Sequence, residues 1–352
     1  MAACRPNASP LLSVVIPAYN AAAYIGPAIS SVLDQLDERS EVIVVDDGST
    51  DTTVDVIRRF GDRVRCIVQA NGGLASARNR GQSEARGEFV AWFDHDDINE
   101  PDRFALQIEI LRRFPEVGLV TSGFSAFNAG GKLADSYDGT YYGRIRQRGI
   151  SALFPAAQLF ESRTVAGVTA RLYYGSVYPE LALGNFVHPP TVMMRSAVWR
   201  VAGPLKYGLT SATDWEFLVR ASRLVQFAYL DRSLLRYRLS DEQMTADSNV
   251  VKNLPGEMRA FELMLEADPS LRSATVEIRG MYRHWNLSLA SAIVAQNRLQ
   301  SLRYLARSLQ YGFDLRTFVT AALHASTPAV LRPTLGRVRR MIRRTMGSGA
   351  TV

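Results

Sequence analysis

A regular alternation of short apolar runs and amphipathic segments over residues 11–122 constrains the fold most. The apolar runs are rich in β-branched and aromatic residues, which is typical of buried strands; they are LLSVVI, EVIVVD, RVRCIV, EFVAWFD and VGLVTS. The segments between them place apolar residues at helical spacing, as at Ile25, Ile29 and Val32. Strands that alternate with helices predict an α/β domain with a mostly parallel sheet.

The pattern changes twice further along the chain. Residues 123–180 are rich in Gly, Tyr and Ser and lack a clear period, so we expect a loop-rich insertion or a flap there. We then expect a helix around DWEFLVRAS, followed by two strand-like runs, VQFAYL and LLRYRL. Beyond these runs, apolar residues recur at helical spacing only. We therefore divide the chain into regions 11–122, 123–250 and a helical region 251–352.

Charge and cysteine content narrow the class of protein. The net charge of +7 is concentrated at the C-terminus, because the chain from Arg298 onward carries ten arginines and one acid, Asp314. The nearly neutral main body argues against a nucleic-acid partner. Cys4 and Cys66 are too few for a disulfide scaffold. No apolar run approaches the ~20 residues of a transmembrane helix, and no signal-peptide pattern opens the sequence, so we expect a cytoplasmic protein.

The carboxyl ends of the strands are where open α/β sheets bind their ligands. The second strand ends in Asp46 and Asp47, ahead of the turn GSTD. A turn that caps the next helix explains Ser49 and Asp51, but it does not explain two adjacent acids after a buried strand. Binding of a base or a ribose by a carboxylate therefore stays open beside capping.

Three carboxylates within four residues, Asp94, Asp96 and Asp97, follow the fourth strand. Like charges held together there repel one another, and a divalent cation relieves that repulsion. Oxygen ligands suit Mg²⁺ or Mn²⁺, which bind one or two protein carboxylates together with substrate phosphates. The alternative is a solvated acidic loop that caps the helix expected near Pro101.

A glycine-rich segment, NGGLASARN, opens the helix expected at 73–86. Its backbone N–H groups and Arg78 suit a pyrophosphate, whereas an ordinary glycine loop with a surface arginine is the plainer alternative. The first strand ends in PAYN instead of the GxGxxG of a dehydrogenase, and the chain lacks the GxxxxGK[ST] of a P-loop.

Taken in order, the motifs PAYN, VVDDGSTD, NGGLASARNRG with GEFVAWFDHDD, and PDRF resemble the nucleotide-binding half of family 2 glycosyltransferases. The resemblance spans residues 11–104 and weakens after about residue 123. It implies a GT-A fold, to which the helical pattern of residues 251–352 adds a C-terminal extension. It also implies a nucleoside-diphosphate sugar donor, with UDP as the default base, and a divalent metal cofactor, Mg²⁺ or Mn²⁺.

The resemblance also assigns roles to residues of the donor half. Pro17 and Tyr19 would border the base, Asp47 would hydrogen-bond it, and Arg78 would lie near the nucleotide.

The acidic cluster would be the DxD-type motif of this family. Asp94 and Asp96 would contact the donor, and Asp96 and Asp97 would bind the metal.

The acceptor half of this family supplies a catalytic base ahead of a helix, and Asp214 occupies that position in SATDWEFLVR. In an inverting transfer this carboxylate takes the proton of the attacking acceptor hydroxyl. Glu216 is the second choice, and His188 is a further candidate on the acceptor side. The chain departs from the family pattern at Thr213, where Glu is usual, and at Ser240, where His is common.

These inferences predict an inverting glycosyltransferase whose acceptor is a hydroxyl of a glycan or a lipid-linked glycan, as in bacterial polysaccharide or envelope synthesis. A metal-dependent nucleotidyltransferase and a non-catalytic nucleotide-sugar-binding protein of the same fold remain as alternatives. Release of NDP from an NDP-sugar separates the transferase from both.

The C-terminal tail predicts a contact with an anionic membrane surface through residues 331–346. Leu331, Leu335, Val338 and Ile342 recur on one helical face among six arginines. A basic amphipathic helix of this kind binds the interface of anionic bilayers, which would place the protein at the inner face of the membrane. A solvated helix, or one packed on its own domain or on a partner subunit, is the alternative.

Overall fold

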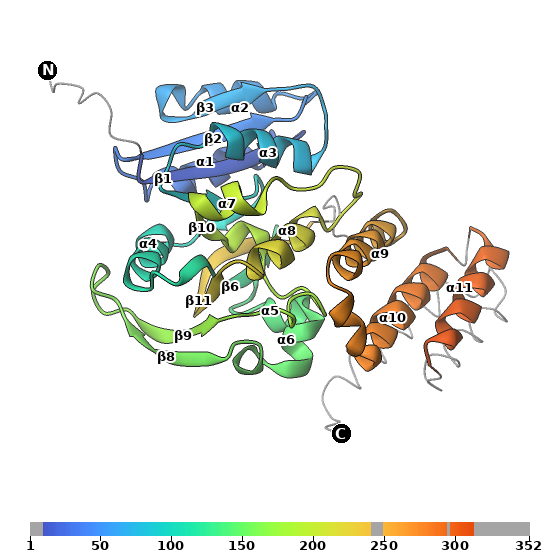
Figure 1. The fold of residues 1–352 in the computed structure, drawn as a ribbon. Coiled ribbons are helices and arrows are strands. Elements are labelled where there is room, and N and C mark those ends of the chain that lie inside the picture. Colours follow the sequence, from blue (N-terminus) through green and yellow to red (C-terminus); the bar gives the residue numbers. More distant parts are fainter. Residues whose placement is uncertain (1–9, 241–248, 294–295, 313–352) are drawn as a thin grey trace, which may run out of the picture. The chain divides into compact units, whose positions relative to one another are not determined.

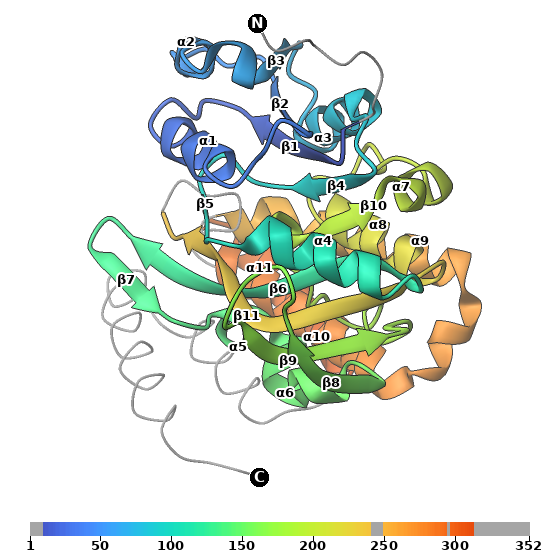
Figure 2. The ribbon, with the colours of Figure 1, turned by 90° about the vertical axis from the view of Figure 1, so that its left-hand side faces the viewer.

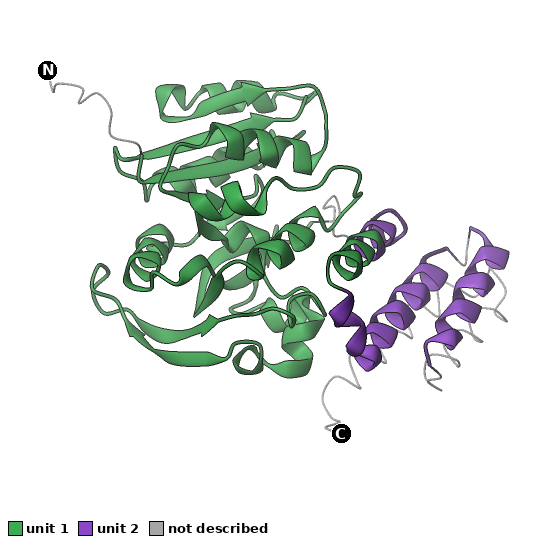
Figure 3. Ribbon diagram, in the orientation of Figure 1, with its two compact units in different colours: residues 1–243, 259–268 green, residues 244–258, 269–352 purple. Residues whose placement is uncertain are grey.

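The computed structural model describes residues 10–240, 249–293 and 296–312. These residues belong to two compact units, which Figure 3 colours separately. The first unit comprises Met1–Gln243 and Arg259–Asp268, and the second comprises Met244–Met258 and Pro269–Val352. The first expected region and the second one up to Gln243 thus share one unit.

Four parallel strands form the first half of the sheet, in the order β3-β2-β1-β4. They are β1 (Leu12–Ala18), β2 (Ser40–Asp46), β3 (Arg65–Val68) and β4 (Phe89–Trp92). The connecting elements are α1 (Ile25–Leu33), α2 (Thr53–Arg58), the 3-10 turn η1 (Gly61–Arg63) and α3 (Leu74–Glu84). In Figure 2, α1 and α2 lie on one side of these strands and α3 on the other. Both faces are therefore covered, and every residue of β1 and β4 is buried.

The second half of the sheet is joined to the first by β10 (Met193–Arg195), which pairs antiparallel with β4 and with β6 (Val117–Asn128). β11 (Gln226–Arg238) is parallel to β6, and β9 (Thr169–Gly175) and β8 (Ala156–Glu161) continue to the far edge. Among the described strands on this path, β10 and β9 run against the rest. The predicted α/β class with a mostly parallel sheet is confirmed (Figure 1).

Shorter elements surround this sheet. They are β5 (Ile98–Asn99), α4 (Arg103–Arg113), η3 (Pro189–Thr191), α7 (Ser196–Ala202) and α8 (Thr213–Ser222). β5 pairs with β11 and therefore ties the segment after β4 to the second half of the sheet. The Phe217 ring of α8 lies 5.2 Å from the fully buried Trp92 ring of β4, so one core spans both halves.

The expectation of a loop-rich insertion or flap at 123–180 is wrong. β6 continues to Asn128, and the segment contains further β7 (Gly131–Ala134), α5 (Asp138–Tyr141), α6 (Gly143–Arg148), η2 (Ile150–Ala152), β8 and β9. β8 and β9 lie at an edge of the sheet and are only partly buried, so they need few apolar residues and leave a weak pattern. VQFAYL and LLRYRL likewise belong to the single strand β11, whose exposed Asp231 and Arg232 interrupt the apolar run.

The C-terminal part is helical, as the sequence predicts. It consists of α9 (Val250–Ala267), η5 (Pro269–Ser273), α10 (Thr275–Ile293) and α11 (Arg298–Gln310). Within the described ranges, no helix is both long and apolar enough to cross a membrane. The predicted membrane-binding segment 331–346 lies outside the described residues.

Candidate active site

The turn after β2 is held by its own side chains. Asp46 accepts a hydrogen bond from the Ser49 N–H at 3.1 Å, so this acid caps the turn. Asn20, at the end of β1, accepts from the Thr50 N–H at 2.8 Å and donates its own N–H to the Ser49 hydroxyl at 2.9 Å. The ends of β1 and β2 are thereby joined, and Pro17 and Tyr19 lie on this joined edge, with Tyr19 46% exposed.

Asp47 organises the glycine-rich loop ahead of α3. Its Oδ1 accepts from Gln69 Nε2 at 2.7 Å and from the Gly72 N–H at 2.9 Å, and its Oδ2 accepts from the Gly73 N–H at 2.7 Å. Gly48 approaches the same loop so closely that an added Cβ would lie 2.9 Å from the Asn71 nitrogen. The predicted contact of Asp47 with the base stays a prediction.

Arg78, on the first turns of α3, is fully buried. Its guanidinium pairs with Asp94, with 2.7 Å between NH2 and Oδ1, and lies 4.8 Å above the Trp92 ring. Nε and NH1 have no hydrogen-bond partner among the described residues. Arg78 is thus no surface arginine, and it connects the glycine-rich segment directly to the acidic cluster.

The three acids of the cluster differ in their surroundings. Removal from water raises the pKa of Asp94; Arg78 opposes this shift, and Asp96 and Asp214 add to it. Burial also raises the pKa of the fully buried Asp97, and Asp96 and Asp94 raise it further. Asp96 is partly exposed. The cluster therefore concentrates negative charge that the surrounding protein only partly compensates.

Two arginines that the sequence analysis did not select hold this cluster. Arg238, at the end of β11, donates its N–H to Asp97 Oδ1 at 3.0 Å and its Nε to the Asp96 carbonyl at 2.7 Å. Arg103 is fully buried and donates NH2 to the Trp92 carbonyl at 3.1 Å. Burial lowers the pKa of Arg103 to about 9, while Asp97 and Asp94 counteract the shift. Arg103 belongs to the motif PDRF, so this motif could have identified it from the sequence.

The cluster offers a cation few protein ligands. In the described ranges, no group of three or more His, Cys, Asp or Glu side chains could hold a metal. Asp97 Oδ2, however, is buried and has no hydrogen-bond partner among the same residues. One or two carboxylates plus ligands from elsewhere fit the way Mg²⁺ and Mn²⁺ are bound beside substrate phosphates. The residues present therefore fit the implied metal, provided that the substrate completes its coordination.

Asp214 comes to the same edge from the other half of the sheet. It lies in the first turn of α8, which begins after Ala212 in the left-handed conformation (φ 59°). Its Oδ1 accepts from the Trp215 N–H at 2.8 Å. Because Asp214 contributes to the raised pKa values of both Asp94 and Tyr142, its charge acts on both residues. The structure thus brings Asp214 into electrostatic range of the Arg78–Asp94 pair.

Glu216 and His188, the other two candidates of the acceptor half, have partners within the protein. Glu216 is 2% exposed and pairs with Arg220 Nε at 2.9 Å and Lys206 Nζ at 3.1 Å. The His188 ring is 4% exposed and stacks on Phe124, with 4.0 Å between ring centroids. Burial, with a contribution from Arg103, lowers the pKa of His188 to about 3, so this ring is neutral. Their predicted substrate contacts stay predictions, and the geometry favours structural roles.

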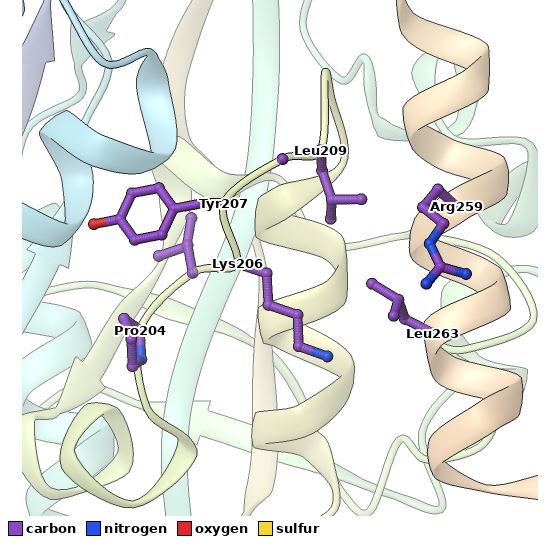
Figure 4. A pocket seen from close by; sticks show the side chains of 8 residues that line it. Pro204, Lys206, Tyr207, Leu209, Arg259 and Leu263 are labelled. Atoms are coloured by element: carbon purple, nitrogen blue, oxygen red, sulfur yellow. The ribbon is translucent and has the colours of Figure 1, made fainter.

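A cavity of about 580 Å³ opens beside the loop that leads to α8. Pro204–Leu209 line one wall, and Arg259 and Leu263 project from α9 on the other (Figure 4). Tyr207 is 67% exposed at this loop. The cavity thus combines aliphatic walls with a tyrosine and two basic side chains, Lys206 and Arg259.

Known proteins resemble part of this chain. Residues 13–164 match the family model described as glycosyl transferase family 2. An uncharacterized glycosyltransferase of Rickettsia typhi is 28% identical over 67% of this chain and 66% of its own length. Hyaluronan synthase of Pasteurella multocida is 37% identical over 39% of this chain and 15% of its own length. The chain spans just under two thirds of the first relative and a much smaller part of the second.

Solved structures agree on the fold. S. aureus TarS matches with a TM-score of 0.56 at 19% identity, over 94% of this chain and 53% of that one. TarS 1–349 in complex with UDP-GlcNAc matches with a TM-score of 0.51 at 16% identity, over 86% and 89% of the two chains. The comparisons and the sheet agree: residues 13–164 match glycosyl transferase family 2, and the chain has the GT-A fold.

Proposed function

We propose that this protein is an inverting glycosyltransferase that moves a sugar from a nucleoside-diphosphate sugar, by default a UDP-sugar, to an acceptor hydroxyl. One observation carries the proposal: the Arg78–Asp94 pair and Asp214 come from different halves of the chain, and the charge of Asp214 acts on Asp94. S. aureus TarS is solved with UDP-GlcNAc and with UDP, which supports a nucleotide-sugar donor.

The donor nucleotide would lie across the ends of β1 and β2. Tyr19 is exposed there and offers a ring to the base, next to Pro17. Asp47 Oδ2 accepts a hydrogen bond from the Gly73 N–H, and a carboxylate oxygen can accept another from a base N–H. Asp94 and Asp96 would meet the ribose and the diphosphate, where the buried Arg78 offsets negative charge that develops on the leaving group.

Asp214 would act as the general base. Its charge acts on Asp94, and its carboxylate would take the proton of the acceptor hydroxyl that attacks the anomeric carbon. Attack from the face opposite the leaving nucleotide inverts the anomeric configuration.

A divalent metal, Mg²⁺ or Mn²⁺, would be held by Asp96 and Asp97 together with the donor. When bound, it neutralises charge on the diphosphate of the leaving nucleotide. Asp96 is the more accessible of the two acids, and Asp97 is fixed by its bond from the Arg238 N–H.

The acceptor would be a glycan or a lipid-linked glycan of polysaccharide or envelope synthesis, as the hyaluronan synthase relative suggests. We place the part of the acceptor beyond its reacting hydroxyl in the cavity of Figure 4. The loop that lines this cavity reaches Asp214 five residues after Leu209. Aliphatic walls with a few polar groups are the usual lining of a ligand pocket of this size.

The deciding experiment is a panel of UDP-, GDP-, dTDP- and CDP-sugars with Mn²⁺ or Mg²⁺, read out as NDP release. We expect NDP from one donor class, with inverted configuration in the product. Pyrophosphate release from an NTP would instead identify a nucleotidyltransferase. Nucleotide-sugar binding without any turnover across a glycan acceptor panel would identify a binding protein, and a retained configuration would remove Asp214 as the base.

A further inference from the structure

The loop between α7 and α8 is attached to α3 by one buried side chain. Asn79 is 7% exposed, and its amide uses both ends: Oδ1 accepts from the Leu205 N–H at 2.9 Å, and Nδ2 donates to the Leu205 carbonyl at 2.9 Å. These two bonds join residues 126 positions apart in the sequence. Asn79 thus binds both the N–H and the carbonyl of Leu205 in this loop.

The same loop is attached to α8 on its other side. Lys206, the next residue after Leu205, pairs with Glu216 of α8 at 3.1 Å. Arg220, one turn further along α8, donates NH2 to the Pro204 carbonyl at 2.8 Å and Nε to Glu216 at 2.9 Å. The loop is therefore fixed to two helices within three consecutive residues.

The two helices carry the two parts of the candidate site. Asn79 directly follows Arg78, which pairs with Asp94, and Glu216 is two residues from Asp214. α3 itself is packed tightly on the sheet, because a Cβ added at Gly81 would lie 2.4 Å from Val15 Cγ1. The connection from α3 through Leu205 to α8 is thus short, buried at one end and built on a fixed helix.

We propose that Asn79 is a positioning residue, which sets the placement of Asp214 relative to the Arg78–Asp94 pair through the loop at Leu205. This inference rests on the proposed function. Asn79 acts through the loop and α8. Because a small displacement of a reacting group costs about 100-fold in rate, loss of this attachment lowers turnover while the donor half remains intact.

The first test compares Asn79→Ala with Gln82→Ala. Gln82 lies on the same helix, is 4% exposed and has no hydrogen-bond partner for its side chain among the described residues. Both variants lose a buried amide, but only Asn79→Ala releases Leu205. We expect Asn79→Ala to lower kcat about 10- to 100-fold, to leave the affinity for UDP with Mn²⁺ within about twofold, and to speed hydrogen exchange in the peptide over 203–212. Gln82→Ala leaves kcat and this exchange unchanged.

The second test removes the more exposed interaction of the same connection, the one between the loop and α8, and it applies even if Asn79→Ala does not fold. Lys206→Met removes the ion pair with Glu216 from a side chain that is 41% exposed. We expect Lys206→Met to lower kcat less than Asn79→Ala does. In the double variant Asn79→Ser with Lys206→Met, the fold-loss of kcat should be smaller than the product of the two single fold-losses, because both changes act on the same connection.

Two results would overturn the inference. One is wild-type kcat in Asn79→Ala or Asn79→Ser despite faster exchange at 203–212; the other is an equal loss of kcat in Gln82→Ala. A wild-type protein that releases no NDP from any donor would instead count against the proposed function.

Discussion

The two halves of the sheet build their parts of the site in different ways. In the donor half, side chains that act together stand close in the sequence, as Asp94, Asp96 and Asp97 do, because each motif directly follows a strand. In the acceptor half, Asp214 is a single residue on a helix, and its charge acts on Asp94 and Tyr142, which come from distant segments. The donor half can therefore be identified from motifs, whereas the acceptor half depends on how separate segments pack.

The largest expected effect tests the donor half. Asp96→Ala removes the accessible acid of the cluster, so we expect turnover to fall at least about 1,000-fold and metal-dependent nucleotide binding to disappear. Asp97→Ala should do the same. Exposed Asp62 provides a matched control, since Asp62→Ala changes the same charge away from the site. If both cluster variants bind UDP with the metal dependence of the wild type, the acids only cap a turn.

The second prediction tests the acceptor half. Asp214→Asn keeps the size of the side chain but removes its basicity, so kcat should fall by about 10²–10⁴-fold with donor affinity nearly unchanged. Single-turnover rates and UDP titration measure the two quantities, and Asp231→Asn on an exposed part of β11 is the control. Lower thermal stability with a normal rate would mean that Asp214 serves only the start of α8.

The third prediction concerns how the edge of the acceptor half is attached to α4. Burial alone would raise the pKa of Glu109, but hydrogen bonds from Ser162, Thr164, the Arg163 N–H and Arg113 lower it from 4.5 to about 2. A lowered folded-state pKa stabilises the protein above the unfolded pKa, and this stability is lost as the pH falls from about 4.5 toward 2.

We therefore expect Glu109→Gln to cost about 2 kcal/mol at pH 7 and progressively less between pH 4.5 and 2. Urea unfolding at several pH values measures the difference. Glu116→Gln, on an exposed residue just after α4, should show no such trend. A loss that stays constant down to pH 2 would contradict the assignment.

The fourth prediction concerns the acceptor cavity. Tyr207→Ala removes an exposed ring at the cavity, so the acceptor KM should rise by about three- to tenfold while donor affinity stays the same. Val201→Ala, at a 72% exposed position of α7, is the control. An unchanged acceptor KM for every acceptor length tested would place the acceptor elsewhere.

The smallest effect concerns residues 331–346, outside the described residues. We propose that this segment binds an anionic membrane, each arginine contributing about 1 kcal/mol near the surface. The full chain should co-sediment with anionic vesicles at low salt, and a chain ending at Thr327 should remain in solution. Equal recovery of both chains, or binding that ignores salt, would rule out this contact.

The sequence predicted the strands and helices of the donor half well, because each short apolar run there is a separate buried strand. It did not predict that Arg78 is fully buried, since an arginine in a glycine-rich helix start has no pattern that marks its exposure. His188 illustrates the same limit: its aromatic neighbours Phe124 and Tyr142 come from distant segments. The prediction for residues 123–180 is wrong because an edge hairpin that is half solvated does not need alternating apolar residues.

The β8–β9 hairpin has a consequence for how such enzymes diversify. Among the described strands outside the hairpin, β11 is the one that pairs with it, through β9, and Glu109 accepts a hydrogen bond from Ser162 in its turn. Neither attachment involves the Arg78–Asp94 pair or Asp214. A hairpin of different length or sequence could therefore be exchanged at this edge, as an interchangeable module, if it kept the pairing and a hydroxyl for Glu109. Related proteins could in this way differ in the surface at this edge of the sheet while the residues of the candidate site stay unchanged.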